Sequence, residues 1–184
     1  MTQPLTQLLK RLQGGDSDAL DALFAAAYPE LERLARARLR GGGRNTVLNT
    51  SALVHESYLR FVKMGELRAE DRRAFFAYAS QVMRSIIVNT ARDRLAGKRG
   101  GDWERITLAE QIVDGRVSDE ETILNMDEAL EVLEATNPRL AQVAQMRYFG
   151  GYSEKEIAEA LAITERTVRR DWEKARIILS AALR

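Results

Sequence analysis

The sequence of 184 residues has no cysteine, one histidine and three prolines. Without cysteine the chain cannot form disulfides, thiolate metal sites or cysteine nucleophiles. The single histidine, His55, excludes metal sites built from several imidazoles, and it is expected on a helix surface. Long apolar stretches are absent too, because no run approaches the roughly 20 residues that a membrane-spanning helix needs.

Two further absences concern targeting and catalysis. Residues 1–12 lack the basic segment and apolar core of a secretion signal, so we expect a cytoplasmic protein without membrane association. The glycines at 41–43 lack the Gly-Lys-Ser/Thr ending of a phosphate-binding loop. Carboxylates are abundant, but none stands in the isolated apolar surroundings that raise a catalytic pKa. We therefore expect no enzymatic activity, no cofactor and no metal.

The net charge of +1 conceals a strong variation along the chain. Residues 1–100 carry 17 basic and 10 acidic side chains, residues 101–136 carry 2 and 11, and residues 137–184 carry 9 and 6. Two basic units thus flank an acidic stretch. Basic units suit a polyanionic partner, although charge alone favours the plainer interpretation of a solvated surface with chance clustering.

Apolar residues recur at helical spacing between glycine-containing breaks. This spacing predicts a first helix from Leu5 to Leu12, a second with Asp16 as N-cap that extends to Leu39, a third over about 50–64 and a fourth over about 69–98. The best strand candidate, 105–113, is short and lies in the acidic stretch. The chain is therefore predicted to be all-α.

Two helical domains are expected, at 1–98 and 122–184, joined by an acidic linker at 99–121. The second contains a capping box, because Ser153 and Glu156 can exchange hydrogen bonds. After a short connection, Thr164 is a good N-cap for a helix over 165–183. The apolar stripe of that helix consists of Val168, Trp172, Ala175 and Leu179.

The opposite face of the helix over 165–183 is basic. Its charged residues are Arg166, Arg169, Arg170 and Glu173. A capped short helix, a tight turn and a second helix with a basic outer face predict a DNA-binding helix-turn-helix, whose arginines reach guanine edges or phosphates in the major groove. The alternative is an ordinary helical hairpin with a charged exterior.

Four segments carry a family resemblance in the same order along the chain: 15–31, 53–61, 76–94 and 164–179. Together they resemble the extracytoplasmic-function (ECF) sigma factors, the small sigma subunits of bacterial RNA polymerase. The second segment resembles the family's polymerase-binding helix, the third the helix that opens and recognises the −10 promoter element, and the fourth the helix that recognises the −35 element.

The resemblance implies a region 2-type domain at 1–98 and a region 4-type helix-turn-helix domain at 122–184. Its implied partners are promoter DNA and core RNA polymerase, which is bound through the clamp helices of the β′ subunit, and it allows an anti-sigma factor as a further partner. The implied polymerase contacts are Leu53, Val54, Glu56 and Tyr58. The implied −10 contacts are Arg84, Asn89, Arg92, Arg94 and Lys98. The implied −35 contacts are Arg166, Thr167, Arg169, Arg170 and Lys174.

The residues support these roles in part. Opening a DNA strand needs basic side chains for phosphates and polar or aromatic groups for unstacked bases. The arginines of 84–99 supply the charge, and the Asn89 amide can donate and accept hydrogen bonds. The helical spacing of Phe75 and Phe76 favours core packing for both rings.

One departure from the family pattern concerns the start of the polymerase-binding helix. That helix usually opens with acidic residues, whereas here residues 36–55 contain none and hydroxyls stand at Thr50 and Ser51. A phosphate there would carry about −1.5 to −2 charges and would be stabilised by the helix dipole. We hypothesise that a Ser/Thr protein kinase activates the protein by phosphorylation at Thr50, or else at Ser51. The alternative is that these hydroxyls only cap the helix and that apolar contacts suffice for polymerase binding.

Two other questions have competing answers. The acidic stretch could thread a basic polymerase channel or fold back on the basic helices and restrain DNA binding. A solvated linker that leads into a helix near 125–134 is preferred for its later half, and 102–121 remains undecided.

For the whole chain, the rival functions are an autonomous helix-turn-helix regulator that binds paired sites as a dimer and an adaptor that contacts only proteins.

Overall fold

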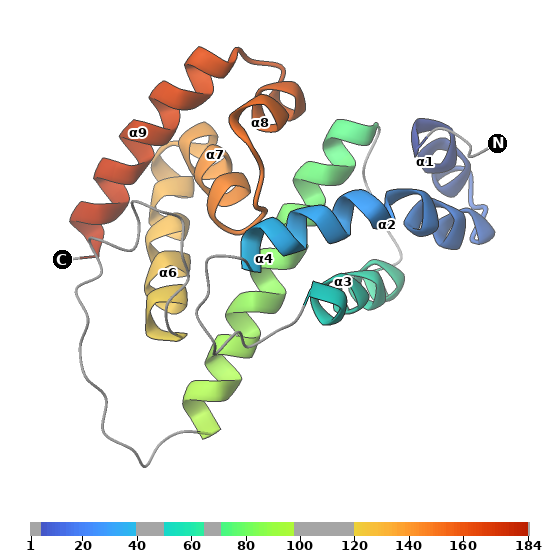
Figure 1. The fold of residues 1–184 in the computed structure, drawn as a ribbon, viewed down its shortest axis with the longest axis horizontal. Coiled ribbons are helices and arrows are strands. Elements are labelled where there is room, and N and C mark those ends of the chain that lie inside the picture. The colour runs from blue at the N-terminus through green and yellow to red at the C-terminus, as the bar shows by residue number, and fades with distance from the viewer. Residues whose placement is uncertain (1–4, 40–49, 65–70, 98–119, 184) are drawn as a thin grey trace.

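The computed structural model describes residues 5–39, 50–64, 71–97 and 120–183, and within them it contains eight α-helices and no strand (Figure 1). The predicted all-α fold is therefore confirmed for these residues. No helix in these ranges is both long and apolar enough to cross a bilayer. The helices are α1 (Leu5–Gln13), α2 (Asp18–Leu39), α3 (Thr50–Met64), α4 (Arg72–Gly97), α6 (Glu120–Thr136), α7 (Pro138–Tyr148), α8 (Glu154–Leu161) and α9 (Glu165–Ala182).

Side-chain caps determine where several helices begin. The carboxylate of Asp16, the predicted N-cap of α2, accepts hydrogen bonds from backbone amides at the start of that helix. α4 begins at Arg72 rather than near residue 69, because Asp71 accepts a hydrogen bond of 2.8 Å from the amide of Ala74. Asn137 caps α7 in the same way and precedes a proline at the first helical position.

The N-terminal helices pack around a row of aromatic rings. The ring centroid of Phe61 lies 5.9 Å from that of Phe24 and 5.5 Å from that of Phe75. Phe75 and Phe76 are both buried, which confirms the core role that their spacing predicted. Stacked and edge-to-face pairs of this kind join α2, α3 and α4 into one unit.

The C-terminal helices build their own layer of the core. Tyr148 and Phe149, at the end of α7, are almost fully buried and pack edge to face at 4.9 Å. α6 begins at Glu120, so the end of the predicted linker 99–121 is helical. Residues 98–119, which include the strand candidate 105–113, lie outside the described residues.

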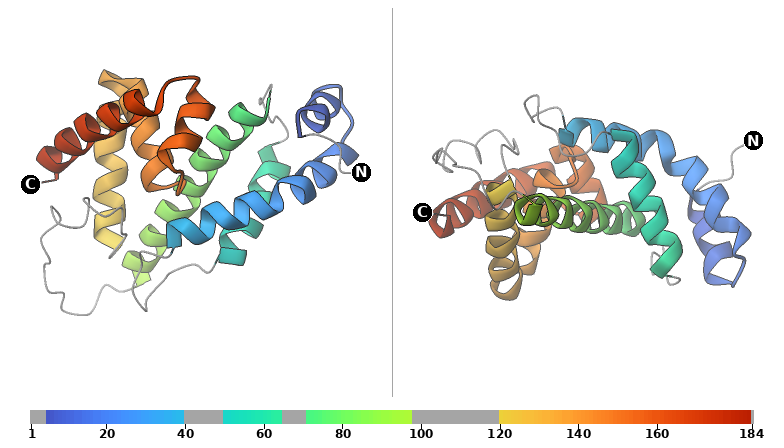
Figure 2. Two further views of the ribbon diagram at one scale, coloured as in Figure 1. Left: turned by 45° about the horizontal axis from the view of Figure 1, so that its top comes forward. Right: turned by 90° about the horizontal axis from the view of Figure 1, so that it is seen from below.

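The two halves of the chain pack directly against each other. α4 contacts α6, α7 and α8, and Figures 1 and 2 show it between the C-terminal helices and the α2–α3 pair. The buried residues of both halves form one continuous core. A face of α4 that carries predicted DNA contacts is thereby brought against the C-terminal half.

Candidate nucleic-acid interface

Local hydrogen bonds build the helix-turn-helix formed by α8 and α9. Ser153 accepts a hydrogen bond of 3.3 Å from the amide of Glu156, whose carboxylate accepts one of 2.8 Å from the amide of Ser153. Ala162 ends α8 in the left-handed conformation, with φ of 53°. Thr164 then accepts a hydrogen bond of 3.1 Å from the amide of Thr167. The predicted capping box and N-cap are therefore both confirmed.

α9 buries one side and exposes a basic one. On the inner side Val168, Ala175 and Leu179 are buried and Trp172 is half-buried, as the apolar stripe predicted. The predicted DNA contacts that are exposed on the outer side are Arg166, Arg169, Arg170 and Lys174. This row lies on the solvent-exposed side of α9.

Three of the predicted −35 contacts have intramolecular partners, and for Arg170 the partner is the Asp171 carboxylate at 3.6 Å. The other two, Arg169 and Thr167, make hydrogen bonds at the start of α9. Arg169 donates to the Glu154 carboxylate of α8 at 2.9 Å, and this hydrogen bond raises the pKa of the guanidinium further above its usual range. Thr167 is half-buried, and its hydroxyl lies 2.9 Å from that of Thr164. Both contacts fix the start of α9 relative to α8, so these two side chains position the helix as well as present polar groups.

Asp171 is a buried acid that sequence reasoning missed. Its side chain is only 1% exposed, and its carboxylate accepts a hydrogen bond of 2.7 Å from Arg139 of α7. The position lies on the inner side of α9, next to Trp172, so the stripe itself contained the signal. A carboxylate at such a position requires a charged or hydrogen-bonding partner, because an unpaired buried charge is strongly unfavourable.

The predicted −10 contacts do not share one exposed surface. Arg92 is exposed, and it donates a long hydrogen bond of 3.4 Å to the side chain of half-buried Asn89. Arg94 is half-buried, and its guanidinium lies 3.8 Å from the Glu120 carboxylate of α6. Lys98 lies outside the described residues.

Arg84, the remaining candidate, faces the C-terminal half. Its Nε donates to the Asp127 carboxylate at 2.6 Å, and a second nitrogen donates to the backbone carbonyl of the same residue at 3.0 Å. A third nitrogen donates to the side-chain oxygen of Gln145 at 3.0 Å. The side chains of Arg84 and Asp127 are only 12% and 14% exposed. In this arrangement the Arg84 guanidinium is bound to protein groups and is withdrawn from solvent.

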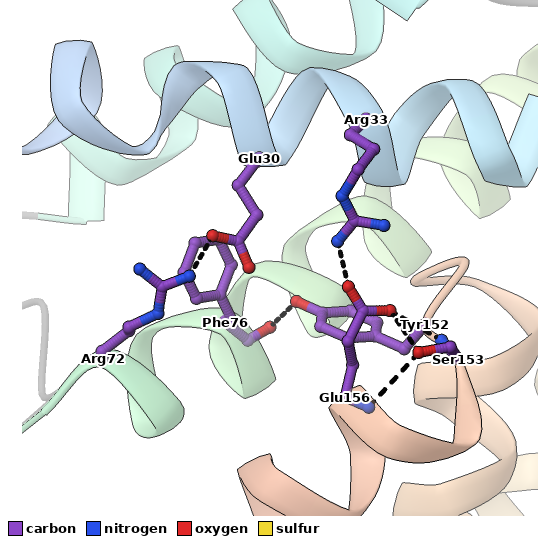
Figure 3. Close-up of polar contacts among 7 residues, drawn as sticks. All are labelled: Glu30, Arg33, Arg72, Phe76, Tyr152, Ser153 and Glu156. Atoms are coloured by element: carbon purple, nitrogen blue, oxygen red, sulfur yellow. Dashed lines mark hydrogen bonds and ion pairs between the residues drawn. The ribbon is translucent and has the colours of Figure 1, made fainter.

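A second interdomain contact, here called the tyrosine latch, lies at the start of α8 (Figure 3). The buried Tyr152 hydroxyl donates to the backbone carbonyl of Phe76 in α4 at 2.6 Å. Burial, followed by the charges of Glu30 and Glu156, raises the pKa of Tyr152 far above its usual range. Arg33 of α2 forms an ion pair with Glu156 beside it. The latch therefore ties the helix-turn-helix to both α2 and α4.

A glycine makes the position of Tyr152 possible. A Cβ atom at Gly150 would lie 2.5 Å from the Tyr152 ring and 2.8 Å from the carbonyl of Met146. No side chain fits at these distances without a shift of the backbone or of the ring. The absence of a side chain at Gly150 thus allows the Tyr152 ring to lie against the backbone at that residue.

The predicted polymerase-binding helix exposes less apolar surface than the sequence indicated. Leu53 and Val54 are completely buried, each 0% exposed, so in this structure their side chains belong to the core and not to a contact surface. Tyr58 is half-buried, and its hydroxyl donates to the Asp21 carboxylate of α2, which raises the pKa of Tyr58. Glu56 is half-buried near Arg60, at 3.8 Å.

A shallow groove lies on the outer surface between α2 and α3. The residues that line it are Asp21, Phe24, Ala25, Tyr28, Ser51, His55 and Tyr58. His55 is exposed, as expected for a helix-surface residue. Thr50 and Ser51 occupy the first turn of α3, which contains no acidic residue; Ser51 is exposed and Thr50 half-buried. The candidate modification sites thus stand at an accessible helix start beside the groove.

Comparison with known proteins identifies the family. Neither the curated proteins nor the solved structures yield a match. The family model described as ECF sigma factor matches residues 2–184, which is nearly the whole chain. The helical fold, with a capped helix-turn-helix at its C-terminal end, agrees with that match. The chain therefore belongs to the ECF sigma factors, transcription initiation factors that bind core RNA polymerase and promoter DNA.

Proposed function

We propose that this sigma factor is activated by phosphorylation of Thr50, or else of Ser51, which supplies negative charge at the start of the polymerase-binding helix. The observation that carries the proposal is the first turn of α3, where hydroxyls stand and acids are absent. A Ser/Thr protein kinase is the implied partner. In this proposal the clamp helices of the β′ subunit bind the outer surface formed by α2 and α3.

The burial of Leu53 and Val54 supports a need for added charge. With both side chains in the core, the large apolar groups on the outside of α3 are the half-buried Tyr58 and the 38% exposed Leu59, among residues 50–61, whose side chains the structure describes. This is a small surface for a purely apolar contact. A charge-assisted contact to a basic partner surface would add both affinity and a faster association rate.

The geometry of the helix start supports a phosphate at this place. The first amides of α3 lack intrahelical partners, and the helix dipole favours negative charge near them. The phosphate would carry about −1.5 to −2 charges and three acceptor oxygens. It would therefore serve both as a cap for α3 and as the acidic group that the family pattern implies.

A neighbouring carboxylate supports Thr50 over Ser51 as the modified residue. Ser51 lines the same groove as Asp21, so a phosphate on Ser51 would face a like charge. Thr50 is the first residue of α3 and is absent from the lining of that groove. We accordingly expect the larger effect from modification of Thr50.

The promoter contacts are assigned to two helices. In the proposal α9 recognises the −35 element through Arg166, Arg170 and their neighbours, which are exposed. α4 recognises the −10 element through its arginines and Asn89. The division into a domain at 1–98 and a domain at 122–184, joined by a linker, assigns one promoter element to each domain.

In vitro transcription with bacterial core RNA polymerase and a promoter library tests both the sigma role and the switch. We expect weak transcription by the unmodified protein and at least tenfold more by kinase-treated protein or by the Thr50→Glu variant. Ser17→Glu is the matched control, because Ser17 is also an exposed hydroxyl at the start of a helix. It should not activate.

Three results would count against parts of the proposal. Equal transcription by treated and untreated protein would keep the sigma role and discard the switch. Full kinase activation of a Thr50→Ala, Ser51→Ala double variant would move the switch to another residue. Specific DNA binding without polymerase, together with no transcription from any form, would favour an autonomous regulator.

A further inference from the structure

The acidic helix α6 lies against two arginines of α4 that are candidate DNA contacts. Its Asp127 carboxylate is 2.6 Å from Arg84, and its Glu120 carboxylate is 3.8 Å from Arg94. Glu134 approaches Arg84 to 4.0 Å from the exposed edge of the same helix. Three carboxylates spaced seven residues apart along α6, or about two turns, thus face Arg84 and Arg94 of α4.

The acids of α6 fall into two groups by burial. The carboxylates that meet α4 most closely are withdrawn from solvent: Glu120 is buried and Asp127 is only 14% exposed. Those that face away from α4 are exposed, namely Glu121, Glu128 and Glu131. The helix expected near 125–134 in fact begins at Glu120, and the charge of Asp127 within it is paired with Arg84.

We propose that α6 acts as an internal competitor of nucleic acid, occupying Arg84 and Arg94 of α4 until promoter DNA displaces it. This inference rests on the proposed assignment of Arg84 and Arg94 to the −10 strand. A guanidinium presents the same fork of donors to a carboxylate as to a phosphate. Arg84 donates from its Nε and from both terminal nitrogens to α6 and α7. Because its side chain is also only 12% exposed, a DNA phosphate has little access to it in this arrangement.

The free energy of the Arg84–Asp127 contact allows a DNA phosphate to replace the carboxylate on the arginine. Burying the Arg84–Asp127 pair removes two charges from water, and separation restores their hydration, which offsets part of the lost attraction. A DNA phosphate can then replace the carboxylate on the arginine. The tyrosine latch opposes the opening, because Tyr152 must leave a buried site and Arg33 must release Glu156.

Binding of a fluorescent single-stranded 20-nucleotide DNA to the full chain, followed by anisotropy, tests the competition. Asp127→Asn removes one negative charge from α6 at the contact, and Glu128→Gln removes one at the neighbouring exposed position. The two variants have the same net charge, so general attraction of DNA affects both equally. Asp127→Asn should bind the DNA at least threefold more tightly than Glu128→Gln. A plot of the logarithm of its binding constant against the logarithm of the salt concentration should be steeper by about 0.7 for each additional DNA phosphate that the protein neutralises.

A double variant assigns the tighter binding to the proposed residue. Adding Arg84→Gln to Asp127→Asn should return the affinity to that of Glu128→Gln. Equal affinities of Asp127→Asn and Glu128→Gln would overturn the proposal. So would an increase in affinity that persists without the arginine, because DNA would then bind elsewhere.

A reversible crosslink that holds the two halves together tests whether they must separate before DNA binds. It leaves the Arg84–Asp127 contact unmutated. Arg73 of α4 and Lys155 of α8 are exposed and line one cleft, and the chain has no cysteine of its own. A short bis-methanethiosulfonate crosslinker forms a disulfide with each cysteine of the Arg73→Cys, Lys155→Cys variant and releases methanesulfinate. The crosslink should weaken binding of the same DNA, and reduction of the disulfides should restore it. Equal binding before and after reduction would overturn the proposal. Transcription assays judge the sigma function separately, since these binding measurements contain no polymerase.

Discussion

The tyrosine latch provides the sharpest test of the packing between the two halves. Tyr152→Phe removes the hydroxyl that donates to the Phe76 carbonyl at 2.6 Å and keeps the buried ring, which is 4% exposed. The carbonyl retains its helical partner within α4, so no buried acceptor is left unpaired. The expected loss is therefore the net value of one neutral hydrogen bond, about 0.5–1.5 kcal/mol.

Thermal unfolding followed by circular dichroism measures this loss. For a chain of this size, about 1 kcal/mol corresponds to a fall in Tm of about 2–4 °C. Tyr28→Phe is the matched control, because the Tyr28 side chain is 40% exposed and its hydroxyl can be replaced by water contacts. We expect no measurable change in Tm for this control.

The pH dependence of stability adds an independent readout of the same residue. Burial raises the pKa of Tyr152 in the folded protein, so its protonated hydroxyl contributes stability that is fully present below the pKa of an unfolded tyrosine, about 10. That contribution is lost as the pH rises above this value. The free energy of unfolding should therefore fall more steeply above about pH 10 for the wild type than for Tyr152→Phe.

A defined result would refute this reasoning. If Tyr152→Phe had the Tm and the alkaline pH dependence of the wild type, the hydroxyl would not be buried at the α4 interface in solution. A parallel fall for Tyr28→Phe would mean that the assay does not distinguish buried from exposed hydroxyls. The residual alkaline slope in Tyr152→Phe is expected to come from Tyr58 and Tyr78, whose pKa values are also raised.

Two other predictions concern the C-terminal half. Gly150→Ala should destabilise the protein by about 1–3 kcal/mol, because the new Cβ would lie 2.5 Å from the Tyr152 ring and 2.8 Å from the Met146 carbonyl. Urea denaturation measures this change in the free energy of unfolding. An unaltered urea midpoint would contradict the close approach of the ring to residue 150. Arg139→Ala should cost about 1–3 kcal/mol, because it leaves the Asp171 carboxylate, 1% exposed, without its closest partner. Replacing both residues, with Asp171→Asn added, should recover part of that loss in the same assay, and a purely additive loss would show that the pair is not coupled.

Features that depend on near neighbours in the chain were predictable. The all-α fold, the capping box at Ser153 and the N-cap at Thr164 involve residues within one helical turn of each other, so sequence spacing is sufficient to locate them. Phe75 and Phe76 were assigned to the core for the same reason. The exposed arginines of α9 follow from the burial of its opposite face.

The candidate site was less predictable, because an amphipathic pattern does not say what its apolar face contacts. Leu53 and Val54 lie on the apolar side of α3, and the pattern suits a partner surface and a core equally well. The structure places both in the core. The buried position of Asp171 follows from the apolar stripe of α9, but its partner, Arg139, does not, because it lies on a different helix.

The sequence by itself determined the four N-terminal helices, the helix-turn-helix with its two caps and, through the ordered family segments, membership of the ECF sigma factors. Only the tertiary structure decided how the two halves meet: Tyr152 on Phe76, Arg33 on Glu156 and Arg84 on Asp127. These contacts join helices that are far apart in the chain, and no local spacing specifies them. They arise from shape and charge complementarity between complete surfaces, which exist only once each half has folded.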